Sequence, residues 1–159
     1  MTDLRQFEQT FIKTFKGQTK IALLSFGFIA FIVIIEEILR YSSRPFYGWG
    51  GIAFSQLSKW RYLIYAFSVA VLISMRLIQG ILTRISPEID FHQALQRLSL
   101  GTLIPICLAE VPAILGFIFF LLTGLVRDFY VLTIVSVILL FMYFPRKSLW
   151  QEKLGRFFS

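Results

Sequence analysis

Four long apolar runs, separated by short polar segments, are the feature that most restricts how this sequence can fold. The hydrocarbon core of a bilayer is about 30 Å thick, so a helix needs roughly 20 apolar residues to cross it. Four such helices and their connections use nearly all of the 159 residues. We therefore predict one all-α integral membrane domain, a four-helix bundle of two hairpins. The predicted transmembrane helices are residues 21–39, 62–82, 102–125 and 129–144.

The charge distribution supports this class of protein. Charged residues make up 16% of the chain, against roughly a quarter in soluble domains, and they are concentrated between the apolar runs. In a soluble protein the net charge of +7 would indicate nucleic-acid binding. Here the basic residues flank the apolar runs, so membrane topology accounts for them. We expect the lipid bilayer to be a partner and nucleic acid not to be one.

The positions of lysine and arginine predict the orientation. Eleven of the 16 basic residues lie at the predicted end of the bundle that holds both termini, and five lie at the other end, here called the outer end. Cytoplasmic segments carry the excess of basic residues in membrane proteins. Both termini are therefore predicted to be cytoplasmic, and we place the chain in a bacterial inner membrane.

Amphipathic segments are predicted at both ends of the chain. In residues 1–19, apolar side chains recur every three or four positions, which places them on one face of a helix. This helix is expected to lie on the membrane surface or, alternatively, to pack on a partner protein. Residues 146–159 form a basic cytoplasmic tail. In the polar connector before the third span, Ser86 and Pro87 suit the start of a short helix.

Glu110, in the third span, is the residue with the clearest functional potential. A charge inside a bilayer costs roughly 3 kcal/mol or more, so such residues usually face a bundle interior and often mark function. Arg76 lies at nearly the same predicted depth in the second span. Three roles are open for Glu110: a packing pair with Arg76, an ion or proton site, or a contact with a partner subunit.

Two prolines in the third span are expected to kink it. Pro105 and Pro112 cannot donate a backbone hydrogen bond, so each frees a carbonyl group one turn earlier in the helix. Freed carbonyl oxygens close to Glu110 would provide the oxygen cluster that a proton or small cation needs. Small polar residues within the spans are expected to bond across helices or to their own backbone. These residues are Ser68, Ser74, Thr133 and Ser136.

Three charged residues mark the outer end of the first span. Glu36 and Glu37 lie within its last turns, and Arg40 follows them at i+4 and i+3. Local ion pairing and snorkelling can satisfy charges in this position. We interpret them as anchors or loop-packing residues, with a functional role as the alternative.

Enzyme chemistry has little support in this sequence. The only cysteine, Cys107, lies inside an apolar run, and the only histidine, His92, lies in a linker. These two residues do not have metal-ligand spacing, and neither a P-loop nor a glycine-rich dinucleotide motif is present. We predict a protein that is not an enzyme and that holds no cofactor or metal.

The segment LAEVPAILGFIFFLLTG, residues 108–124, resembles the ion-carrying helix of rotary ATPase proteolipids, the c-type subunits. That resemblance implies that Glu110 is an ion-binding carboxylate. The LAEV stretch is also similar to the glutamate motif of small multidrug resistance transporters, which have four spans. Taken whole, the chain looks most like the uncharacterised small four-span proteins of bacterial membranes, which implies a fold and a location.

Two functions are consistent with these observations. The first is an accessory, assembly or anchoring subunit of a larger membrane complex, because the chain has no solvated domain and little chemistry. The second is proton or cation translocation through Glu110, in a ring or in a dimeric transporter. Partner subunits or further copies of the chain are expected in either case.

Overall fold

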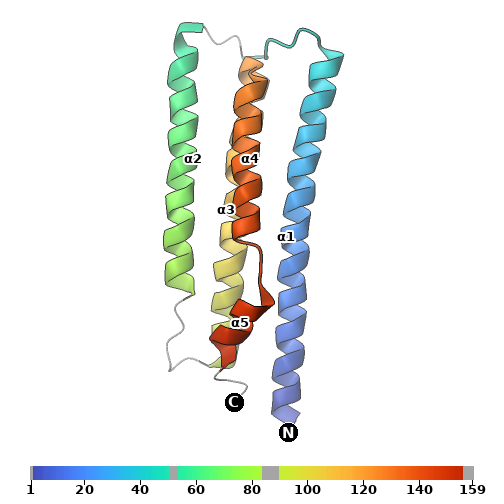
Figure 1. Cartoon of the computed structure of the whole chain (residues 1–159), viewed down its shortest axis with the longest axis vertical. Coiled ribbons are helices and arrows are strands. Elements are labelled where there is room, and N and C mark those ends of the chain that lie inside the picture. The colour runs from blue at the N-terminus through green and yellow to red at the C-terminus, as the bar shows by residue number, and fades with distance from the viewer. Residues whose placement is uncertain (1, 51–53, 84–89, 156–159) are drawn as a thin grey trace.

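A computed structural model describes residues 2–50, 54–83 and 90–155. These residues form five helices and connecting loops (Figure 1). The helices are α1 (Thr2–Ser42), α2 (Phe54–Leu82), α3 (Phe91–Thr123), α4 (Val126–Met142) and α5 (Lys147–Leu154). The helix start predicted at Ser86 and Pro87 lies outside the described residues.

The four long helices lie side by side, and successive helices run in opposite directions (Figure 1). α3 is the common neighbour, because it packs most extensively against α4, then against α2, then against α1. Gly116 allows the close approach of α3 to α4, since a Cβ atom there would lie 3.0 Å from the Cβ atom of Leu132. Small residues at helix interfaces permit such packing in membrane proteins.

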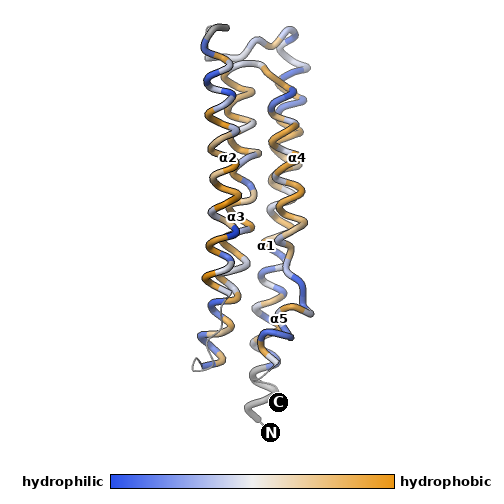
Figure 2. Tube along the Cα trace, turned by 60° about the vertical axis from the view of Figure 1, so that its left-hand side comes forward, coloured by the Kyte–Doolittle hydropathy of each residue, from blue (hydrophilic) through white to orange (hydrophobic). Residues whose placement is uncertain are grey.

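Within the described residues, three helices are long and apolar enough to cross a membrane: Glu8–Ser42 of α1, Gln56–Leu82 of α2 and Phe91–Thr123 of α3. A fourth crossing is reached only if α4 and α5, which meet at a 44° bend, count as one span. Hydrophobic residues occupy the middle of the long helices and hydrophilic residues gather toward the two ends (Figure 2). The all-helical class and the apolar helices are confirmed, whereas four crossings in two hairpins remain a prediction.

α1 is one continuous helix of 41 residues, where the sequence suggested a surface helix followed by a separate span. Gly17 is the only helix-weakening residue near the expected break, and one glycine costs only about 1 kcal/mol. The apolar face of the first part packs on the chain itself. Phe11 and Phe15 contact Trp150 of α5, with ring centroids 6.3 and 5.8 Å apart.

α3 begins about eleven residues earlier than the span expected from hydropathy. Phe91, Leu95 and Leu98 share one helical face and are buried with Trp150 and Leu154 of α5. Polar residues between these positions lower the local hydropathy, and for this reason the sequence predicted a polar connector here. The basic tail therefore contributes α5, a short helix docked on the early part of α3.

The loop after α1 is attached to the turn between α3 and α4. The amides of Trp49 and Gly50 donate to the carbonyl oxygens of Leu121 and Leu122, at 2.8 and 3.0 Å. Gly124 in the turn has φ of 74°, a left-handed conformation that suits glycine. We call this end of the bundle the loop end, and the end that carries α5 the terminal end.

Candidate functional site

Among the described residues, Arg76 and Glu110 do not form an ion pair with each other. The ion pairs of the described residues join Arg40 to Glu36 and Glu37, and Arg61 to Asp128. Arg76 is exposed on α2, and Glu110 is half-buried on α3. No Arg76–Glu110 ion pair is among those of the described residues, and the packing pair, the ion site and the partner contact remain predictions for Glu110.

The two prolines of α3 are buried, and the helix continues through both of them. Next to Pro112, the amide of Ala113 donates to the Ser136 hydroxyl of α4 at 2.8 Å. The polar residues of α2 instead bond to their own backbone, since Ser68 and Ser74 donate to carbonyl oxygens one turn earlier. Ser136 thus links α4 to α3 at Ala113, three residues after Glu110.

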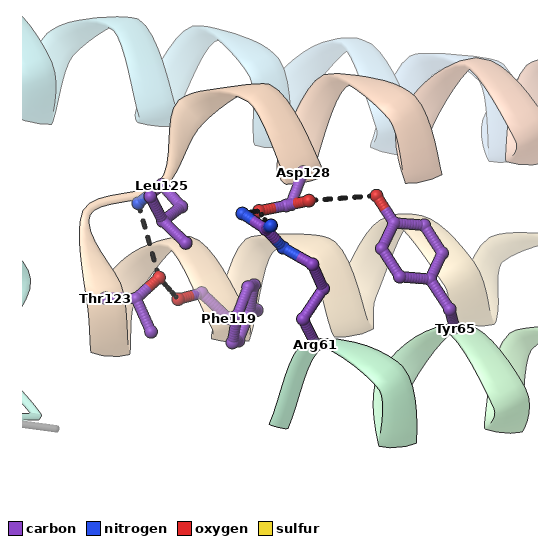
Figure 3. A network of polar contacts seen from close by, with 6 residues as sticks. All are labelled: Arg61, Tyr65, Phe119, Thr123, Leu125 and Asp128. Atoms are coloured by element: carbon purple, nitrogen blue, oxygen red, sulfur yellow. Dashed lines mark hydrogen bonds and ion pairs between the residues drawn. The ribbon is translucent and has the colours of Figure 1, made fainter. Parts of the chain in front are cut away.

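The first polar cluster at the loop end connects α2 to α4 (Figure 3). Asp128 accepts three hydrogen bonds: from Arg61 Nε at 3.1 Å, from Arg61 Nη2 at 2.8 Å and from the Tyr65 hydroxyl at 3.0 Å. The Asp128 side chain is only 6% exposed, whereas that of Arg61 is 40% exposed. Asp128 also lies in the first turn of α4, where the helix dipole favours a negative charge.

The second polar cluster at the loop end connects α1 to α4. The Tyr130 hydroxyl lies 3.0 Å from Glu36 Oε2 and 2.6 Å from Glu37 Oε1. Arg40 donates from Nη2 to Glu37 Oε2, while its Nε atom is 3.9 Å from Glu36 Oε1. The Glu36 side chain is completely buried, and its Oε1 atom has no hydrogen-bond partner. Glu36 is thus a more deeply buried carboxyl group than Glu110.

A third polar contact lies toward the terminal end. Gln18 of α1 donates to the Ser99 hydroxyl of α3. Its Oε1 atom is buried and has no hydrogen-bond partner. The contact links α1 to α3 one turn before Ala22, the first α1 residue of the central apolar cluster.

The described residues contain no group of three or more His, Cys, Asp and Glu side chains that could hold a metal ion. Cys107 is exposed on α3. His92 is exposed at the start of α3, and its ring packs edge-on against Phe91 at 5.7 Å. The chemistry that these clusters offer is ion pairing of Asp and Glu with arginine, and proton exchange between carboxyl groups and tyrosine.

Several residues of these clusters were not singled out by sequence reasoning. These residues are Arg61, Tyr65, Asp128 and Tyr130. The available signal was the i, i+4 spacing of Arg61 and Tyr65, which places both on one face of α2. Comparisons with protein families, with curated proteins and with solved structures find no match for this chain.

Proposed function

We propose that the chain is a non-enzymatic accessory, assembly or anchoring subunit of a larger membrane complex. The observation that carries this proposal is Arg76, an exposed cation on a membrane-length helix that has no ion-pair partner among the described residues. By the helical rise, Arg76 lies about 9 Å from the end of α2 at Leu82. An arginine at this depth can extend its long side chain toward the headgroups, or it can pair with a carboxylate on a neighbouring helix, which is the partner that we propose.

The face of α2 around Arg76 is suited to a protein partner. Ile73 and Leu77, one turn before Arg76 and next to it, are 58% and 62% exposed. Ala66 and Ala70, on the side of α2 that carries Ile73 and Leu77, are also exposed, and such small residues permit close helix contacts in membranes. A neighbouring transmembrane helix that carries a carboxylate would satisfy Arg76 and cover these apolar side chains.

Replacement of Arg76 tests this proposal. We expect the tagged Arg76→Leu chain to fold but to lose the polypeptides that co-purify with the wild-type chain after gentle extraction. Arg97→Leu is the matched control, since Arg97 is exposed on the polar first part of α3. Unchanged co-purification by a folded Arg76→Leu chain would contradict the proposal.

A second candidate function is proton or cation translocation through Glu110. It is favoured by one specific observation: Glu110 has no ion-pair partner among the described residues, so its carboxylate is not neutralised by Arg76. Hydrophobic carbodiimide is then expected to modify Glu110, and sodium to protect it if the transported ion is sodium. An unreactive Glu110 in the folded protein would exclude this function.

The bacterial inner membrane and cytoplasmic termini belong to the same proposal. The first part of α1 and the helix α5 lie at the same end of the bundle, which is compatible with termini on one side of the membrane (Figure 1). The excess of basic residues at that end supports a cytoplasmic location. Accessibility of a cysteine placed near either terminus would test it.

A further inference from the structure

We propose that Glu36 binds a proton at neutral pH and that Glu36, Tyr130 and Glu37 form a proton-binding site at the loop end. This site is separate from the Arg76 face and does not depend on the proposed assembly. It uses residues from α1 and α4 that sequence reasoning interpreted as anchors.

The number of hydrogen atoms in the cluster carries the argument. A tyrosine hydroxyl has one hydrogen to donate, and an ionised carboxylate has none. The Tyr130 oxygen nevertheless lies 3.0 Å from a Glu36 oxygen and 2.6 Å from a Glu37 oxygen, and both are hydrogen-bond distances. With both carboxyl groups ionised, one hydrogen atom would be shared between two negatively charged acceptors in a three-centre bond, and one of these acceptors is buried. A second proton on one of the carboxyl groups gives each contact a hydrogen atom of its own and removes one of the two charges.

Burial and charge assign this proton to Glu36. Glu37 is 46% exposed and accepts a hydrogen bond from Arg40, so its ionised form is solvated and paired. The Glu36 side chain is fully buried, and the Arg40 Nε atom, 3.9 Å away, is too distant for a hydrogen bond. A buried carboxylate without full compensation is strongly disfavoured. Glu36 therefore donates to Tyr130, Tyr130 donates to Glu37, and the charges of Glu37 and Arg40 cancel.

The surroundings of Glu36 leave Arg40 as the only cation close to it in the described structure. Tyr130 is the titratable group that α4 presents to it. Phe117 and Phe120 of α3 belong to an apolar cluster that also contains Ile32 and Leu39, the α1 residues one turn before Glu36 and nearly one turn after it. Arg44, after the end of α1, lies over the Tyr41 ring at 4.9 Å, and Asp128 is bound to Arg61 on the far side of α4. A neutral Glu36 matches this apolar environment.

The same hydrogen bonds provide a route for the proton. When Glu36 gives its proton to the Tyr130 oxygen, Tyr130 passes its own proton to Glu37. Tyr130 ends neutral, Glu36 is ionised, and the proton leaves to water from Glu37, whose side chain is half-exposed. Loading follows the reverse order. The site therefore exchanges protons with the loop-end surface.

Infrared spectroscopy of the full chain in lipid tests the proposal, because a protonated carboxyl group absorbs apart from a carboxylate. We expect the wild-type protein at pH 7 to show a protonated-carboxyl band that shifts in deuterium oxide and is absent from Glu36→Gln. The glutamine amide can still donate to Tyr130, so this variant should fold. Tyr130→Phe is expected to keep the band but to shift its frequency, since the acceptor of the Glu36 proton is lost.

Glu110→Gln and Glu152→Gln, at carboxyl groups outside this site, are matched controls, and both should retain the Glu36 band. The proposal would be overturned if folded wild-type protein lacks the band at pH 7, or if Glu36→Gln retains it. Loss of the band on addition of sodium at constant pH would also overturn it, because the site would then bind a metal cation in place of a proton. If Glu36→Gln does not fold, the wild-type and Tyr130→Phe spectra decide the question.

Discussion

Replacement of Asp128 by asparagine tests whether charge holds α2 to α4 at the loop end. Asparagine keeps the size of the side chain and can still accept a hydrogen bond from Tyr65. It removes the negative charge that faces Arg61 Nη2 at 2.8 Å. The substitution therefore isolates the ion pair from the packing around it.

The expected cost follows from the exposure of the two partners. Breaking a fully buried pair by removing one partner costs about 3–5 kcal/mol, because a buried charge is left without compensation. Arg61 is 40% exposed and can turn to water or headgroups, which reduces this cost. We expect Asp128→Asn to lower the free energy of unfolding by about 2–3 kcal/mol, between the buried and the surface limits.

The assay is denaturant unfolding in mixed micelles, followed by helical circular dichroism. Asp90→Asn is the matched control, since Asp90 is exposed and its side chain makes no capping hydrogen bond to α3. The control should change stability by less than about 0.5 kcal/mol, as is usual for surface substitutions. If Asp128→Asn were no more destabilising than Asp90→Asn, the assignment of the ion pair as a link between α2 and α4 would be wrong.

Two further substitutions test the packing. Gly124→Ala should destabilise the loop end by about 2 kcal/mol or more, because Gly124 has a positive φ and an added Cβ atom would lie 2.6 Å from a carbonyl oxygen of the loop after α1. Gly80→Ala, in open space on α2, should not lower the stability. Equal unfolding midpoints for the two variants would refute the prediction for Gly124. Ser136→Ala should cost about 1–3 kcal/mol, since the buried bond from the Ala113 amide to the Ser136 hydroxyl is lost. Ser74→Ala, on the exposed side of α2, should be nearly neutral in the same measurement. A neutral Ser136→Ala would show that the bond contributes little.

The sequence predicted the helical class because hydropathy depends on composition along a run of residues. The second span was expected to end at residue 82, and α2 does end at Leu82. The continuity of α1 was not predicted, because a change from amphipathic to apolar character does not itself break a helix. The early start of α3 was also missed, since Phe91, Leu95 and Leu98 follow a helical period that the polar residues between them obscured.

The candidate site was predicted less well for a physical reason. Hydropathy gives the depth of a residue in the membrane but not the direction in which its side chain points around the helix. Arg76 and Glu110 were therefore expected to meet on the basis of depth alone. The pair that the structure does form, Arg61 with Asp128, joins residues 67 positions apart, and no local pattern indicates such a contact. Glu36 was interpreted as an anchor because Arg40 lies close to it in the sequence. The sequence does not indicate that Tyr130 of α4 contacts the Glu36 side chain.

The native mass of the wild-type protein, extracted gently with its own lipids, tests the central claim most directly. The account predicts a defined complex in which the 18.5 kDa chain is bound to other polypeptides. A homo-oligomer of this chain alone would favour translocation through Glu110. A single chain with the mass of one copy would contradict the assignment of the protein as a subunit.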